Sequence, residues 1–240
     1  SGSQGLDLKE TRFGVSAADL GLVGKKSYSI SFWLKINSLK SGQPTTLFNV
    51  YNKQDGWPKT DWGWMWSQLG SDGSLDGVTF RGSDASGNNE LRYKYANTKL
   101  PVGNWVHVTM AFDYNSAGGL RSDLFVNGVK QTVTMWNRTN GSDKTTEPGY
   151  EYNVYNITSG QYLCIGGPLH QRYGLDGIID NVVVWDKVAT EADAKAAMGD
   201  LNAKSLPAGV MAFWDFEKKA TDNYFTSAGT KTVNAGMQDM

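Results

Sequence analysis

The chain has 240 residues and a formal net charge of -1, from 23 Lys and Arg against 24 Asp and Glu. This near balance gives no electrostatic basis for binding nucleic acid or an anionic membrane. No apolar run approaches the roughly 20 residues that span a bilayer, and the single cysteine, Cys164, excludes an intrachain disulfide framework. The many glycines (28), tryptophans (9) and tyrosines (11) predict an all-β protein with short strands and glycine-rich turns.

The first half of the chain alternates in the manner of β-strands. Residues 6–15 form a loose opening with one edge strand. Residues 27–36 predict an internal strand, because their central part is apolar on both faces. Residues 47–51 predict another short strand, and the segments 78–81 and 91–95 predict a hairpin joined by a polar loop.

The stretch from Asn52 to Gly70 contains four of the nine tryptophans. Trp62, Trp64 and Trp66 alternate, so they would share one face of a strand. We expect Trp64 and Trp66, which lie deeper in the strand, to be core residues. Trp57 stands in a polar loop and Trp62 at a strand entrance, and for both we expect exposure.

The centre of the chain, residues 105–130, predicts an antiparallel meander. Its first part alternates apolar and polar residues from Trp105 to Phe112. Asn127-Gly128 then stands between apolar runs, where a type I′ turn requires positive φ at both positions. The segment 135–155 that follows predicts a long polar loop with several aromatic residues, and loops of this length are often functional.

The last third predicts three more strands, at residues 161–165, 175–185 and 209–216. Thr190, with Asp193 three residues later, predicts a capping box that opens one short helix near 190–198. The tail 218–240 is weakly patterned. The chain shows neither an internal repeat nor a linker before about residue 200, so we predict a single domain over residues 1–240.

Several of these segments, in this order, carry a family resemblance. The pieces are SYSISFWLKI (27–36), GNWVHVTMAFDY (103–114), LFVNGVKQ (124–131), YLCIGG (162–167), GLDGIIDNVVVWDKVATEADAKAAM (174–198) and GVMAFWDFE (209–217). The set resembles the laminin G-like, concanavalin A-like jelly-roll domains of the lectin and glucanase type, especially their bacterial branch, over roughly residues 6–217. The resemblance implies an all-β fold of two antiparallel sheets stacked as a jelly-roll sandwich, and the alternating strands agree with it.

The resemblance also implies a function. It favours a non-catalytic carbohydrate-binding module within a larger multidomain chain, located outside the cell, at the cell surface or in the periplasm. The expected partner is an oligo- or polysaccharide, with no nucleic acid and no direct insertion into a membrane. An exposed aromatic ring offers a flat platform to the apolar face of a sugar, and polar side chains can bind its hydroxyls. The candidate ligand-binding residues are Trp57, Asp61, Trp62, Trp136, Arg138, Tyr150, Tyr152, His170, Arg172 and Tyr173.

Two alternatives to a sugar-binding module stay open. Laminin G-like domains also serve as protein-interaction or adhesion domains. The same sandwich hosts glycoside hydrolases and polysaccharide lyases, and a glycosidase needs two carboxylates at the scissile bond. The Glu-x-Asp-x-x-Glu strand motif of the laminarinase-like branch is absent. Its nearest imitation is Glu191-Ala192-Asp193, which falls in the predicted helix, so we predict no catalytic residues.

Cofactors have little support in the sequence. Two histidines and one cysteine are too few for the usual zinc sites. Related folds bind structural Ca²⁺, which takes oxygen ligands, and the carboxylates on either side of Gly177, Asp176 and Asp180, are the candidates. An Asp-Gly pair is also typical of a plain turn, so we expect no cofactor other than this calcium ion.

Overall fold

The computed structural model describes residues 5–52, 65–81, 90–95, 97–116, 119–137, 142–144, 157, 159–169, 171–217, 219–221 and 224–238. Within these residues the chain forms two antiparallel sheets and two short helices. The smaller sheet has seven strands, β1 (Leu6–Asp7), β14 (Asp176–Trp185), β3 (Ser27–Ser38), β8 (Trp105–Ser116), β9 (Gly119–Val126) and β10 (Val129–Lys130) in this order, with β15 (Val210–Trp214) also on β14.

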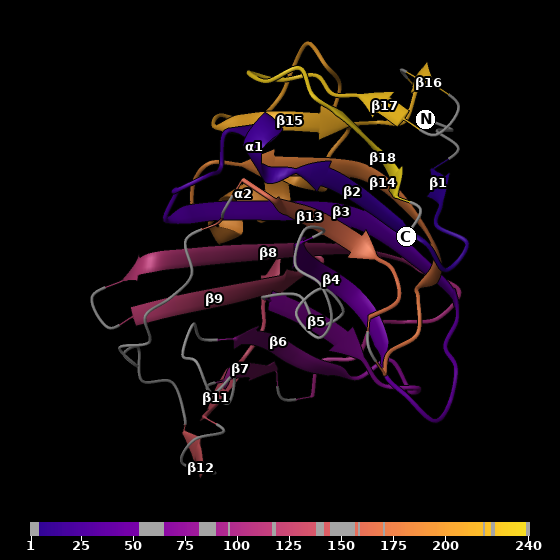
Figure 1. Cartoon of the computed structure of the whole chain (residues 1–240), viewed down its shortest axis with the longest axis vertical. Coiled ribbons are helices and arrows are strands. Elements are labelled where there is room, and N and C mark those ends of the chain that lie inside the picture. The colour runs from indigo at the N-terminus through magenta and orange to yellow at the C-terminus, as the bar shows by residue number, and fades with distance from the viewer. Residues whose placement is uncertain are drawn as a thin grey trace.

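The larger sheet has eleven strands and extends over the full height of the molecule, from β12 to β16 (Figure 1). Its order is β12 (Ser142–Lys144), β11 (Val133–Asn137), β7 (Glu90–Tyr95), β6 (Leu75–Arg81), β5 (Met65–Leu69), β4 (Thr45–Asn52), β13 (Gln161–Gly166), β2 (Arg12–Ser16), β18 (Asn234–Gln238), β17 (Tyr224–Thr226) and β16 (Lys219–Thr221).

The main core lies between the two sheets. Every second residue of each central strand points into it, as for Phe32 of β3, Val108 of β8 and Leu163 of β13, which are at most 1% exposed. The predicted fold class, an all-β sandwich of two antiparallel sheets, is therefore confirmed. The alternation that predicted the strands is the same alternation that separates core residues from the outer faces.

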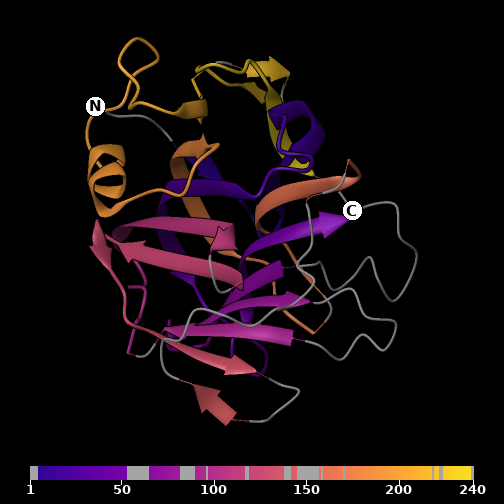
Figure 2. The same ribbon diagram turned by 90° about the vertical axis from the view of Figure 1, so that its left-hand side faces the viewer.

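A second, smaller core covers part of the outer face of the seven-stranded sheet. Helix α2 (Glu191–Ala197) and the chain around it pack there against Phe125, Val183 and Trp185. Figure 2 shows α2 in orange at the side of the molecule, beside the strands of this sheet. The predicted capping box is present, because Thr190 Oγ1 accepts from the Asp193 amide while the Asp193 carboxylate accepts from the Thr190 amide.

The predicted central meander is also confirmed. β8 pairs with β3 and β9, and β9 turns into β10 at Asn127 and Gly128, whose φ angles are 49° and 75°. The positive φ at both positions is the signature of the predicted type I′ turn.

The start and end of the chain contain more structure than the sequence predicted. The expected edge strand is β1, at the edge of the smaller sheet, and the opening also contains β2, which lies inside the larger sheet between β13 and β18. A second helix, α1 (Ala17–Leu20), follows it, because Ser16 caps the turn and Leu20 is buried. The weakly patterned tail contributes β16, β17 and β18, which are ordered by pairing with their neighbours rather than by a long alternation of their own.

The expected loop at residues 135–155 begins with two strands. β11 pairs with β7 over five residues and with β12 over three. Pairing satisfies the backbone groups that β7 would otherwise leave open at the edge of the sheet. Trp136 therefore lies in a strand, not in a loop. Among the described residues, no helix is both long and apolar enough to cross a membrane.

Candidate functional site

Strands β5 and β6 turn polar side chains to the outer face of the eleven-stranded sheet. On β5, Met65 and Leu69 belong to the main core, so the alternating residues Trp66 and Gln68 belong to the opposite face. Asp76 of β6 is exposed between core residues and hydrogen-bonds with Gln68 across the two strands. These strands supply the base of the site.

The segment that follows β13 folds over this face. Gly166 and Gly167 have φ angles of 73° and 85°, which allow the turn. A Cβ at Gly167 would lie 2.6 Å from Arg12 Nε, and Arg12 Nη2 donates to the Pro168 carbonyl at 2.7 Å. Leu169 packs with Trp66 in a small cluster. The turn therefore holds Pro168 and Leu169 against β5.

A line of three side chains connects this segment to both strands. Arg172 Nε donates to Gln68 Oε1 at 2.6 Å, and Gln68 Nε2 donates to Asp76 Oδ2 at 3.0 Å. Since a guanidinium only donates and a carboxylate only accepts, the orientation of the Gln68 amide is fixed. Arg172 Cζ also lies 5.0 Å from the centre of the Trp66 ring, a cation–π arrangement. We call Arg172, Gln68 and Asp76 the polar line.

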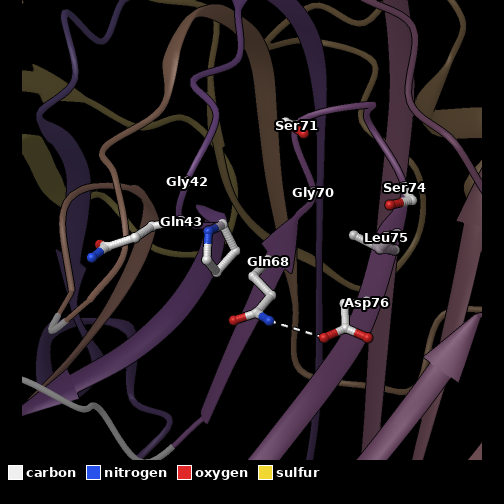
Figure 3. A pocket seen from close by; sticks show the side chains of 9 residues that line it. Gly42, Gln43, Gln68, Gly70, Ser71, Ser74, Leu75 and Asp76 are labelled. Atoms are coloured by element: carbon white, nitrogen blue, oxygen red, sulfur yellow. Dashed lines mark hydrogen bonds between the residues drawn. The ribbon is translucent and has the colours of Figure 1, made fainter.

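A hollow of about 470 Å³ lies beside the polar line. Figure 3 shows Gln68 and Asp76 joined by their hydrogen bond within it, with Leu75 on β6, Ser74 directly before that strand, and Gly42 and Gln43 on the other side of Gln68. Most of its surroundings are polar or glycine. The lining residues are Gly42, Gln43, Pro44, Gln68, Gly70, Ser71, Ser74, Leu75 and Asp76.

Further hydrogen bonds hold the walls of the hollow. The Tyr173 amide donates to the Pro44 carbonyl at 2.9 Å, and Tyr173 Oη donates to the Ser41 carbonyl at 3.3 Å. On the other wall, Asp72 Oδ1 accepts from the Ser74 amide. The hydrogen bond from Lys99, followed by those from Ser74, holds the pKa of Asp72 well below its usual range. The Asp72 carboxylate therefore stays ionised and keeps the turn closed.

The structure places three of the ten predicted ligand-binding residues. Arg172 belongs to the polar line, and Tyr173 supports the wall beside it. Trp136 lies in β11 opposite Arg92, and the register continues through Thr79 to Trp66. β11 is three strands from β5, or about 14 Å at the usual strand spacing. The other seven lie outside the described residues, namely Trp57, Asp61, Trp62, Arg138, Tyr150, Tyr152 and His170.

The two candidate metal ligands do not come together. Asp176 accepts hydrogen bonds from Asn37 Nδ2 at 3.0 Å and Ser38 Oγ at 2.6 Å, and the latter bond in particular lowers the pKa of Asp176. Asp180 Oδ1 accepts from the Asn181 amide. The two carboxylates lie four residues apart on β14, or roughly 13 Å. In the described part of the chain, no group of three or more His, Cys, Asp or Glu side chains could hold a metal ion.

Gln68 and Asp76 were not among the sequence candidates. The available signal was the alternation in Met65–Leu69, which places Gln68 on the same face as Trp66. Trp66 itself was predicted to be a core residue, and it is 1% exposed. It serves as a buried support for Arg172 rather than as an exposed platform.

The family is established by sequence. A family profile described as the concanavalin A-like lectin/glucanases superfamily matches residues 10–195, which is more than half of the chain. The comparison with curated protein sequences finds no match.

Solved structures agree with the fold. A heptameric SAP-like pentraxin from Limulus polyphemus has a TM-score of 0.51 at 14% identity, over 97% of this chain and 91% of that one. A candidate carbohydrate-binding protein from Bacteroides ovatus has 0.50 at 18%, over 97% of this chain and 59% of that one. The CBM40 of a Ruminococcus gnavus sialidase, solved with α2,3-sialyllactose, has 0.50 at 15%, over 81% and 96%. At these identities the likeness shows the fold alone.

Proposed function

Because this chain belongs to the concanavalin A-like lectin/glucanase superfamily, we propose that it is a non-catalytic carbohydrate-binding domain whose site is the hollow beside the polar line. The observation that supports the proposal is the polar line. Arg172, Gln68 and Asp76 fix one another by hydrogen bonds of 2.6 and 3.0 Å, so the donors and acceptors beside the hollow are preorganised. Preorganised polar groups bind hydroxyls without a large ordering cost.

The chemistry of the hollow suits a sugar. A pyranose presents hydroxyls that both donate and accept. Among the residues that line the hollow, Gln68 and Ser74 can both donate and accept hydrogen bonds, and Asp76 can accept them. Pro44 adds an apolar contact for C–H groups. The orientation of the Gln68 amide is set, so the hollow would discriminate between sugars by the positions of their hydroxyls.

The arrangement of carboxylates supports binding rather than hydrolysis. Asp76 is the one carboxylate among the described residues that line the hollow, and it accepts a hydrogen bond from Gln68. Glycoside hydrolysis uses a pair of carboxylates on either side of the scissile bond. We therefore propose binding without turnover and without a metal ion, so that chelation by EDTA leaves affinity unchanged.

The remaining parts of the proposal concern context. We place the domain outside the cell, at its surface or in the periplasm, within a larger multidomain chain that acts on or adheres to glycans. Labelling of intact cells with an antibody against the domain tests the location. Labelling only after lysis would contradict it.

The test uses affinity electrophoresis over a panel of polysaccharides, followed by calorimetry with the matching oligosaccharides. Hydrogen bonds to charged groups contribute about 1.5–3 kcal/mol, so Arg172→Ala should weaken binding at least about tenfold. Gln68→Glu should act similarly, because it sets a carboxylate against Asp76. Lys204→Ala, on an exposed turn, is the matched control.

Trp57→Ala and Trp136→Ala test the aromatic candidates in the same assay. The proposed site is refuted if no glycan in the panel binds, or if the polar-line variants bind with the same affinity as the wild type. A protein partner captured by the wild type in the absence of any sugar response would favour the adhesion alternative. Release of reducing sugar from the panel would favour a hydrolase.

A further inference from the structure

Two tryptophans with solvent-exposed surface, Trp33 and Trp105, lie on the outer face of the seven-stranded sheet, away from the polar line. Trp105, at the start of β8, is 43% exposed, and Trp33 of β3 is partly exposed. The other tryptophans whose side chains are described, Trp66, Trp185 and Trp214, are at most 1% exposed. Trp105 is therefore the most exposed of the described tryptophan side chains.

The strand register places the two tryptophans next to each other. Trp33 pairs with His107, and Trp105 pairs with Lys35. Trp33 and Trp105 therefore occupy diagonal positions on one face, about 7–8 Å apart at Cα. β14 extends both rows, with Ile178 opposite Lys35 and Asp180 opposite Trp33. We call this surface the tryptophan face, made of Trp33, Lys35, Trp105, Ile178 and Asp180.

The helix and its flanking segments cover a different part of the same sheet. The small core beneath α2 contains Ala111, Phe125, Val183 and Trp185. Neither Trp33 nor Trp105 belongs to the core clusters formed by the described residues. Figure 2 shows α2 at one end of β8 and β9, so much of the sheet is free of the helix. Among the described residues, the small core beneath α2 therefore does not extend over the tryptophan face.

Two local features support a binding role. His107 is fully buried, and among the described residues neither of its ring nitrogens has a hydrogen-bond partner. Its ring contacts that of Trp33 with centroids 5.2 Å apart at 68°, so an unpartnered polar group lies directly under the face. β14 has a bulge between Asp180 and Val183, and bulges redirect side chains at functional surfaces.

We propose that the tryptophan face is a second carbohydrate-binding surface. A pyranose ring stacks its C–H face on Trp105, since an exposed indole offers a flat apolar platform with a polar edge. Lys35 donates to hydroxyls and Asp180 accepts from them on either side of the ring, while Trp33 contacts the next sugar. The ligand class is shared with the proposed function, but no residue is.

The two surfaces lie on the outer faces of opposite sheets. Because the two surfaces face in opposite directions, one polysaccharide strand would not reach both of them on a single domain. A domain with both sites filled would therefore link two neighbouring polysaccharide strands. Binding at two sites on a polymer raises the apparent affinity well above that of either site. The domain would therefore behave as a bivalent module on a polysaccharide and as a simple binder of short sugars.

The test compares Trp105→Ala with the wild type, using cellohexaose, xylohexaose and α2,3-sialyllactose as probes. Calorimetry should give two sites for at least one probe, and Trp105→Ala should remove one of them or weaken it about tenfold. Trp105→Phe, which keeps a ring, should restore part of the binding. Val129→Ala, at a 58% exposed position in the same sheet, should bind like the wild type.

The outcomes separate the two surfaces. Loss of the second site in Trp105→Ala, with the Arg172-sensitive site intact and an unchanged unfolding temperature, supports the proposal. One site in the wild type that Arg172→Ala abolishes would overturn the tryptophan face and leave the proposed function standing. Two sites that Trp105→Ala leaves unchanged would also overturn it. Absence of binding to every probe would overturn it together with the polar-line site.

Discussion

Acid should destabilise this protein through one buried histidine before its carboxylates titrate. Burial lowers the pKa of His107 to about 4, because the imidazolium would lose its hydration among the strands. Lys35 lies diagonally across from His107 on β3, and Asp180 lies opposite Trp33 on β14. The ion pair of Asp123 and Lys130 lies further along the same outer face, on β9 and β10. Lys195 of α2 lies against Gly128 at the nearby turn.

The sign follows from the unfolded chain. An unfolded histidine titrates near pH 6.5. Between that pH and the lower pKa of the folded state, the unfolded state binds a proton that the folded state does not bind. The contribution of neutral His107 is fully present above about pH 6.5 and is lost as the pH falls towards 4. The loss amounts to about 2 kcal/mol near pH 5 and approaches about 3 kcal/mol below pH 4.

Chemical denaturation near pH 7 and near pH 5 measures this difference. The wild type should lose about 2 kcal/mol between the two, and His107→Leu should lose much less, whatever its stability near pH 7. The chain has one other histidine, His170, so His170→Gln serves as the control and should behave like the wild type. An equal loss in wild type and His107→Leu would refute the reasoning.

Two predictions concern stability. Truncation after Glu217 removes β18, which pairs with β2, together with the buried Phe225 and its bond to Trp214. Circular dichroism and denaturation should therefore show no cooperative folding, and a cooperative transition would contradict the place of the tail in the sheet. Thr190→Ala should cost about 1 kcal/mol by loss of the helix cap. Thermal unfolding should show Thr190→Ser near wild type, and equal stability of both variants would contradict the cap.

The candidate site was only partly accessible from the sequence. Arg172 and Tyr173 were predicted to bind the ligand, and the structure places both beside the hollow. Gln68 was not predicted as a site residue, because a single glutamine in a strand belongs to no motif and alternation indicates only which face it occupies. Its importance arises from Arg172, 104 positions later in the chain. The predicted aromatic candidates lie mostly in loops. In the sequence Trp105 belongs to a family motif, and only the structure shows that its side chain is exposed.

The sequence by itself determined the features whose causes are local. Alternation over several residues defines the long strands, Asn127-Gly128 defines the turn, and Thr190 with Asp193 defines the start of α2, because each depends on residues within one turn or strand. Only the tertiary structure decided which strands are neighbours and which faces stay uncovered. The short strands β2 and β18 form because they pair with each other and with β13 and β17. The polar line and the tryptophan face likewise depend on side chains that only sheet pairing brings together.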